Sequence, residues 1–207
     1  MYNLIEIDRE LERLSPEMGG VFTRTDLLVL LDISEDSSSK FDRILAQLIK
    51  NKILYRFCRG FYVRDNFDLA VLSQKIDPES YISFTNVLGN ACVVGQVAGN
   101  SIIAVSPRSR PRNFSCSLGR IKYVTIDSKL MDFGIEQKGN LWVAEKERAF
   151  LDVLYFYKKG MKFNFNIYSD VNIDQINIEK VLTYLKKYKN PNFVGFVRSV
   201  INENRKV

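Results

Sequence analysis

The sequence contains no histidine, and this absence removes the side chain that enzymes use most often for proton transfer. A Ser-His-Asp triad, a Cys-His pair and a zinc site built on histidine are all excluded. Proton transfer near neutral pH would need a carboxylate, Lys, Tyr or Cys with a shifted pKa. We therefore expect a protein that is not an enzyme, with no catalytic residue, no metal and no cofactor.

Cysteine is also scarce, and long apolar runs are missing. Cys58, Cys92 and Cys116 lie far apart and fit no metal or redox pattern, so we expect buried, reduced thiols. No apolar run reaches the 18 or more residues of a membrane-spanning helix. Residues 1–8 lack the basic and apolar regions of a secretory signal. These features predict a cytoplasmic protein that does not enter a membrane.

Positive charge is unevenly distributed along the chain, whose net charge is +6. Residues 1–36 carry three basic and nine acidic side chains, whereas residues 37–64 carry seven basic and one acidic. Residues 106–122 hold five basic side chains and no acid, and residues 180–207 hold seven basic and one acid. Such basic stretches are typical of phosphate binding. A solvated basic face without a ligand is the alternative.

The N-terminal pattern predicts three helices followed by a β-hairpin. An apolar stripe predicts a first helix that ends at Ser15-Pro16, and a second helix is capped by Thr23 or Thr25. The predicted elements are helices over 4–14, 23–31 and 40–50 and strands over 53–57 and 61–64. This order predicts a winged helix-turn-helix DNA-binding domain over residues 1–66. A winged helix used for protein contact is the alternative.

The third helix and the hairpin carry the predicted DNA contacts. Arg and Gln read base edges, while Lys and Ser position against phosphates, and a basic hairpin contacts the backbone or the minor groove. The predicted DNA-binding residues are Ser37, Ser38, Ser39, Lys40, Arg43 and Gln47 on the helix and Arg56, Arg59 and Arg64 on the hairpin. The predicted partner is double-stranded DNA of the protein's own promoter.

The second predicted domain, residues 67–207, is mixed α/β, with a small antiparallel sheet and closing helices. The fold class is therefore α+β. Gly119 and Lys138-Gly139-Asn140 are expected at hairpin turns, and Ser83 or Thr85 is expected to cap a short helix. The predicted strands cover 101–106, 113–118, 120–126, 135–137 and 141–143, and the predicted helices 67–76, 145–159, 176–188 and 193–204.

A second basic patch is predicted in this domain. In an extended chain, residues two apart share a face, so Arg108, Arg110 and Arg112 could point one way. Such an arrangement suits a phosphate backbone of DNA or RNA, and we favour a second DNA contact. A flexible basic loop is the alternative. The patch comprises Arg108, Arg110, Arg112, Arg120 and Lys122.

One cluster of acidic residues stands out in the second domain, at 145–152. As an enzyme site, Glu145, Glu147 and Asp152 would be metal ligands for nucleotide chemistry. We instead favour acids at a helix start and a surface ion pair between Arg148 and Asp152, which are four residues apart. Aromatic residues nearby, Trp142 and the Tyr155–Tyr157 segment, are interpreted as core residues, with base stacking as the alternative.

The ordered set of pieces resembles the AbiE-type (AbiEi-like) antitoxins of type IV toxin–antitoxin, or abortive-infection, systems. The resemblance rests on Tyr55–Tyr62 (Tyr-Arg-Phe-Cys-Arg-Gly-Phe-Tyr), Ser80–Leu88, the Arg-rich loop Val105–Arg110 and the string Ala144–Asp152. Ala144-Glu145-Lys146 lacks the Pro that the family tends to have there.

This resemblance implies a bacterial transcriptional repressor of its own operon. It also implies an antitoxin whose C-terminal domain counteracts a nucleotidyltransferase-like toxin without a stable complex. Two alternatives belong to other classes of function. One is an RNA- or nucleotide-processing enzyme that uses the C-terminal domain, and the other is a winged-helix protein-interaction module.

Overall fold

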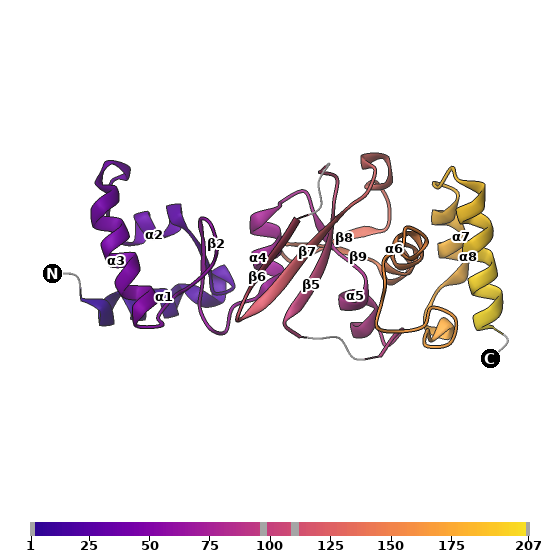
Figure 1. The fold of residues 1–207 in the computed structure, drawn as a ribbon, viewed down its shortest axis with the longest axis horizontal. Coiled ribbons are helices and arrows are strands. Elements are labelled where there is room, and N and C mark those ends of the chain that lie inside the picture. The colour runs from indigo at the N-terminus through magenta and orange to yellow at the C-terminus, as the bar shows by residue number, and fades with distance from the viewer. Residues whose placement is uncertain (1–2, 96–98, 109–111, 206–207) are drawn as a thin grey trace. The chain divides into compact units, whose positions relative to one another are not determined.

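The computed structural model describes residues 3–95, 99–108 and 112–205 and has an α+β fold (Figure 1). Its contacts divide the chain into two compact units. The first comprises Met1–Ile76 with Asn113–Ile121, and the second comprises Asp77–Arg112 with Lys122–Val207. This division falls later than the boundary expected at residue 66. Helix α4 (Leu69–Ile76) belongs to the first unit, where the Lys75 ammonium donates to the Val21 carbonyl at 2.8 Å.

The first unit combines helices with a small sheet around one apolar core. Its elements are α1 (Leu4–Met18), β1 (Val21–Thr23), α2 (Arg24–Leu30), the 3-10 turn η1 (Glu35–Ser37), α3 (Ser38–Lys50), β2 (Tyr55–Cys58), β3 (Phe61–Val63) and α4. The sheet has the order β1-β3-β2, and both pairings are antiparallel. Leu11, Leu27, Phe41 and Leu48 are fully buried between the helices. The amphipathic spacing seen in the sequence therefore forms this core.

Helix α1 does not stop at Ser15-Pro16, as the sequence predicted, but continues to Met18. Pro16 lies in the last turn, where it has no N–H to donate to the carbonyl four residues earlier, yet the helix continues past it. The Ser15 hydroxyl donates to the Leu11 carbonyl at 2.7 Å. Gly19, at φ 63°, then ends the helix in the left-handed conformation. The strand β1 that follows was not predicted from the sequence.

The second unit contains most of a six-stranded sheet, covered by helices. Its elements are β4 (Tyr81–Ile82), α5 (Thr85–Asn90), β5 (Ser101–Ser106), β6 (Arg112–Cys116), β7 (Gly119–Thr125), η2 (Ser128–Leu130), β8 (Ile135–Lys138), β9 (Leu141–Ala144), α6 (Lys146–Lys158), η3 (Ile173–Gln175), α7 (Ile178–Leu185) and α8 (Pro191–Asn204). Residues 113–121 of β6 and β7 are grouped with the first unit. The strand order is β6-β7-β5-β4-β9-β8.

This sheet differs from the small antiparallel sheet that was expected. Strand β4 pairs antiparallel with β5 on one side and parallel with β9 on the other. The turn expected at Gly119 lies one position earlier, at Ser117-Leu118, and Gly119 begins β7. The hairpin between β8 and β9 is confirmed, with Gly139 at φ 60°.

Helix α6 is central to the core of the second unit and lies between the sheet and the pair α7 and α8 (Figure 1). Phe150, Leu151 and Leu154 are fully buried there. Helix α5 is confirmed, but neither Ser83 nor Thr85 caps it, because its N-cap is Phe84 without a side-chain bond. Within the described ranges, no helix has the length and apolar character needed to cross a bilayer.

The three cysteines are free thiols, but none is buried. Cys92 is exposed, and Cys58 and Cys116 are half-buried. The expectation of buried thiols is therefore wrong. The sequence shows only how the cysteines are spaced. The exposure of each thiol depends on the strand face or loop that it occupies, which the spacing does not predict.

Candidate nucleic-acid interface

Helix α3 separates apolar from polar side chains along its whole length. Phe41, Ile44, Leu45 and Leu48 are buried. The opposite face presents Ser39, Lys40, Arg43, Gln47 and Lys50, all of them exposed. The side chains of Arg43 and Gln47 make no hydrogen bond or ion pair with any other residue that the structure describes. These two side chains are therefore available for a ligand outside the protein.

The start of α3 follows directly on the 3-10 turn η1 and has no side-chain cap. Ser37 is its N-cap, but the Ser37 side chain makes no capping bond, and no acidic residue lies in the first turn. Helix N-termini of this kind attract phosphate groups through their N–H groups and the helix dipole. Ser37 is half-buried, whereas Ser38 and Ser39 are exposed beside these donors.

Arg24 joins this surface, although the sequence did not mark it as a contact residue. A capping box between Thr23 and Asp26 begins α2 and places Arg24 in its first turn. Its guanidinium lies 3.3 Å from the Asp42 carboxylate and 4.4 Å from the Phe41 ring centroid. Arg24 thus offsets the only acidic side chain of α3. The capping box was the sequence signal that could have placed it.

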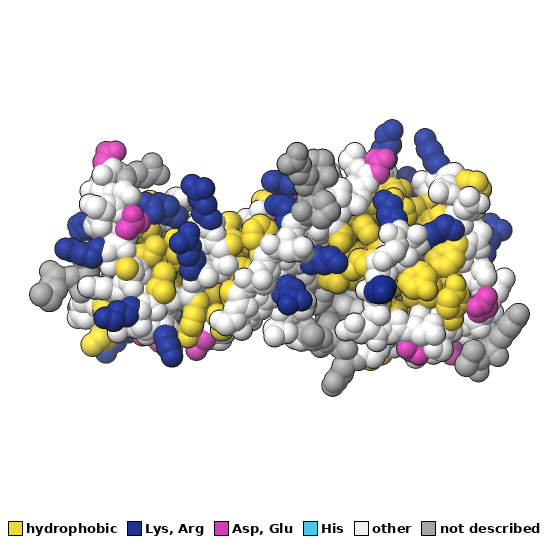
Figure 2. All heavy atoms as spheres, in the orientation of Figure 1, with side chains coloured by type: hydrophobic (Ala, Val, Ile, Leu, Met, Phe, Trp, Pro, Cys, Tyr) yellow, Lys and Arg dark blue, Asp and Glu magenta, His cyan; other side chains and the backbone are white. Residues whose placement is uncertain are grey.

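The hairpin β2–β3 supplies two further cations. Arg56 is exposed on β2, and Arg59 is exposed at the turn, where Gly60 has φ 84°. A register shift between Arg56 and Cys58 gives β2 an irregular pairing with β3. Arg59 makes no hydrogen bond or ion pair to the described part of the chain. Figure 2 shows Lys and Arg side chains (dark blue) spread over the drawn face of this unit.

Arg64, the third predicted hairpin contact, is engaged inside the unit. Its guanidinium forms an ion pair with Asp8 of α1 and donates to the Ile53 carbonyl at 3.4 Å. Only 16% of the Arg64 side chain is exposed. Arg64 therefore ties α1 to the hairpin, and its charge is already paired.

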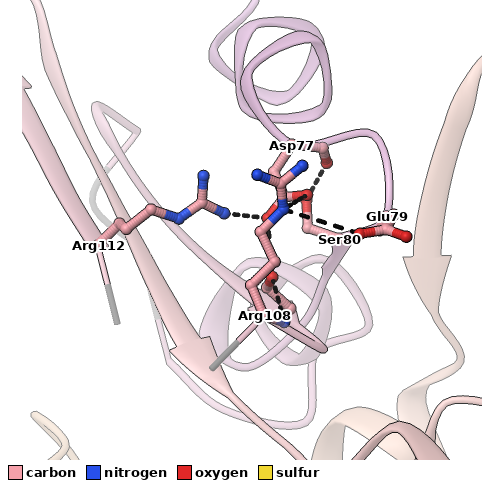
Figure 3. A network of polar contacts seen from close by, with 6 residues as sticks. Asp77, Glu79, Ser80, Arg108 and Arg112 are labelled. Carbon is pink, nitrogen blue, oxygen red and sulfur yellow. Dashed lines mark hydrogen bonds and ion pairs between the residues drawn. The ribbon is translucent and has the colours of Figure 1, made fainter. Parts of the chain in front are cut away.

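The second basic patch divides in the structure. Arg108 and Arg112 converge on the buried carboxylate of Asp77, as Figure 3 shows. Arg112 also lies over the Tyr123 ring at 4.5 Å, and the Ser106 hydroxyl donates to Asp77 at 2.7 Å. Half of the Arg108 side chain stays exposed. Arg108 and Arg112 therefore do not form the row of unpaired guanidiniums that the sequence suggested.

The remaining members of that patch lie apart from the carboxylate. Arg120 is exposed and Lys122 is half-buried, both on β7. Arg110 lies outside the described residues. The sequence did not predict the Asp77 network. Asp77 lies about 30 residues before its partners Ser106, Arg108 and Arg112, and the sequence does not show that the fold brings them together.

The acidic residues at the start of α6 bind to α7 and to the residue before it. The Glu147 carboxylate accepts the Asn177 backbone N–H at 3.1 Å at the start of α7. Glu145 pairs with Lys180 at 2.9 Å and accepts the Tyr184 hydroxyl. Burial acts to raise the pKa of Glu145, but the hydrogen bonds from Tyr184 and Lys180 outweigh it and lower that pKa.

Arg148 and Asp152 form the predicted ion pair, but the pair is buried rather than on the surface. The Tyr81 and Ser83 hydroxyls also donate to Asp152, at 3.0 and 2.8 Å. Complete burial raises the pKa of Asp152, although Arg148 and these hydroxyls act in the opposite direction. No group of three or more potential metal ligands occurs in the described part of the chain.

The sequence matches no protein-family model and no curated protein.

Proposed function

We propose that the first unit is a winged helix-turn-helix domain that binds double-stranded DNA. The observation that carries the proposal is the exposed row Lys40, Arg43 and Gln47 on α3, next in the chain to a hairpin with exposed Arg56 and Arg59. The element order α1-β1-α2-α3-β2-β3 and the strand order β1-β3-β2 support it. A helix-turn-helix consists of two helices, here α2 and α3. Its second helix, α3, enters the major groove, where Arg and Gln read base edges.

Each part of this surface has its own contribution. Helix α3 enters the major groove with Arg43 and Gln47 toward the bases. The N-terminus of α3 with Ser38 and Ser39 lies against phosphate. Arg56 and Arg59 of the hairpin hold the flanking backbone, and each phosphate contact adds to the salt dependence of binding.

The biological role that we propose is repression of the protein's own operon, combined with antitoxin activity against a nucleotidyltransferase-like toxin in the bacterial cytoplasm. The antitoxin role is supported by the resemblance to AbiE-type antitoxins. Two of the segments of this chain that carry the resemblance, 80–88 and 144–152, belong to the second unit. Neutralisation would proceed without a stable complex between the two proteins.

Fluorescence anisotropy with the duplex upstream of the gene tests the DNA-binding proposal. Arg43→Ala should reduce the preference for this duplex over a shuffled one, because base-edge contacts discriminate by about 1–3 kcal/mol each. Arg59→Ala should weaken binding to both duplexes. It should also make the negative slope of log K against log salt less steep, by about 0.9. Arg9→Ala, an exposed arginine on α1, is the matched control. Wild-type behaviour of both Arg43→Ala and Arg59→Ala would refute the assignment.

Co-expression tests the antitoxin proposal separately. A neighbouring nucleotidyltransferase gene is induced with and without this protein, and growth is measured. The Arg43→Ala variant should still restore growth if the second unit neutralises the toxin. Failure of wild-type protein, produced at normal levels, to restore growth would refute the antitoxin role while leaving DNA binding unaffected.

A further inference from the structure

A pocket of about 490 Å³ opens in the second unit, away from the residues assigned to DNA. The end of α6, the α7–α8 connection, the start of α8 and η2 form its walls. Five of its lining residues are lysines, namely Lys129, Lys158, Lys159, Lys187 and Lys189, and we call it the lysine pocket. Its volume falls within the range of about 300–1,000 Å³ that is usual for small-molecule sites.

Most of the positive charge in the lysine pocket is not neutralised. Lys129 and Lys189 are exposed and form no ion pair with the residues that the structure describes. Lys187 lies 3.4 Å from Asp132, but both side chains are more than half exposed, and such pairs contribute little. Asp127 is the one acidic residue of the lining. A strongly anionic ligand therefore fits this charge.

Aromatic rings form the apolar part of the same pocket. Phe193 and Tyr188 are buried beneath it: the Phe193 ring meets Tyr155 edge-on at 5.5 Å and lies 4.8 Å from the Tyr188 ring. Tyr155 is half-buried, so part of its ring remains accessible. The Lys159 ammonium lies 4.4 Å from the Tyr155 centroid. On the face drawn in Figure 2, Lys and Arg side chains surround a hydrophobic area over α6 and the last two helices. A planar apolar group can therefore bind next to the cations.

The start of α8 adds a smaller electrostatic contribution. Its N-cap, Asn190, lines the pocket, and the Asn190 side chain accepts the N–H groups of Asn192 and Phe193 at 2.9 and 3.3 Å. Pro191 has no N–H to offer. This terminus therefore supplies the dipole of a 14-residue helix rather than free donors, and the lysines must make the direct contacts to an anion.

We infer that the lysine pocket binds a nucleoside triphosphate. The ligand places its base against the half-buried Tyr155 ring and its phosphates among the lysines. Inorganic phosphate alone would leave the Tyr155 ring unused, and an uncharged aromatic would leave the charge of the lysines unneutralised. This site is independent of the DNA-binding surface, because all its residues belong to the second unit and none belongs to α3 or the β2–β3 hairpin.

Isothermal titration calorimetry of the full chain tests the inference with ATP, GTP, CTP and UTP, and with inorganic triphosphate and adenosine as separate probes. At least one nucleotide should bind more tightly than both of these. Lys159→Gln combined with Lys187→Gln should weaken that binding at least tenfold. Tyr155→Leu should weaken nucleotide binding while leaving the affinity for inorganic triphosphate unchanged.

Lys186→Gln is the matched control, because Lys186 adjoins Lys187 in sequence but lines a different pocket. It should bind nucleotide like wild type. No binding at millimolar nucleotide would overturn the inference. Equal affinities for inorganic triphosphate and nucleotides would also overturn it, since the base would then have no role. Loss of operator DNA binding in the Lys159/Lys187 variant would reassign the pocket to nucleic acid.

Discussion

The Arg148 guanidinium lies 3.0 Å from the Asp152 carboxylate one turn further along α6, and neither side chain has any solvent exposure. The Arg148 Nη2 also donates to the Tyr81 hydroxyl at 2.6 Å, and the guanidinium lies 4.3 Å from the Phe133 ring centroid. The pair thus joins α6 to β4 in the interior of the second unit. Such a pair is costly to break, because each charge is stabilised mainly by the other.

Asp152→Asn should lower the free energy of unfolding by about 3–5 kcal/mol, since it leaves the Arg148 charge uncompensated in the core. Replacing both residues, Arg148→Met with Asp152→Leu, should recover most of that loss, because no buried charge then remains. Urea unfolding followed by circular dichroism gives both values. A loss below about 1 kcal/mol for Asp152→Asn would contradict the buried pair.

Gly134→Ala should destabilise the protein much more than Gly139→Ala. Both glycines have positive φ, 64° and 60°, so each substitution carries a backbone cost of about 1–2 kcal/mol. At Gly134 a Cβ would lie 2.8 Å from the Arg148 Cβ and 2.9 Å from the Tyr184 ring, whereas Gly139 faces open space. Urea midpoints measure the difference between these matched variants. Equal midpoints would show that the space around Gly134 is not restrictive.

Arg64→Gln should reduce stability rather than DNA affinity. It removes the ion pair to Asp8 and the bond to the Ile53 carbonyl, which together contribute about 1 kcal/mol after allowance for the partly exposed Asp8. Arg59→Gln, at the turn of the same hairpin, should reduce DNA affinity and leave stability unchanged. Thermal unfolding and the salt slope of DNA binding separate the two variants. A smaller salt slope in Arg64→Gln would return Arg64 to the DNA contacts.

Glu145 should make the protein sensitive to acid. Its pKa is lowered in the folded state from an ordinary value of 4.5, so the folded protein binds this proton less readily than the unfolded chain does. The resulting stability is complete above the ordinary value and is lost as pH falls through the lowered one. Glu145→Gln should flatten the pH dependence of unfolding below about pH 5. If the stability of this variant below about pH 5 depends on pH as that of the wild type does, the Lys180 and Tyr184 contacts do not lower the pKa of Glu145.

Sequence alone predicted the elements whose apolar spacing is regular. The helix ending at Lys50, the hairpin at Gly60 and the helix ending at Lys158 follow from periodicity and turn residues. Strands β1 and β4 were missed because three and two residues are too few to show an alternation. Their pairing partners lie far along the chain, and the pattern of a short segment does not contain that information.

The predicted contact residues show a similar limit. Arg43, Gln47 and Arg59 are exposed as expected, because helix and turn geometry decides their direction. Arg64 was grouped with them by charge, and Arg112 with the second basic patch, yet each meets a carboxylate distant in sequence, Asp8 and Asp77. The lysine pocket was not predicted for the same reason: its cations come from three separate segments that only the tertiary fold assembles.

Strand β4 also constrains the order in which the chain can fold. It pairs antiparallel with β5 and parallel with β9, at Ile82 opposite Val143, so one of its partners lies far from β4 along the chain. During synthesis, one edge of β4 stays unpaired until residues 141–144 have emerged. An unpaired edge is prone to wrong pairing, and distant pairings form slowly. Docking of the β8–β9 hairpin onto β4 is therefore the expected slow step of folding, and the stage at which a nascent chain most needs protection from aggregation.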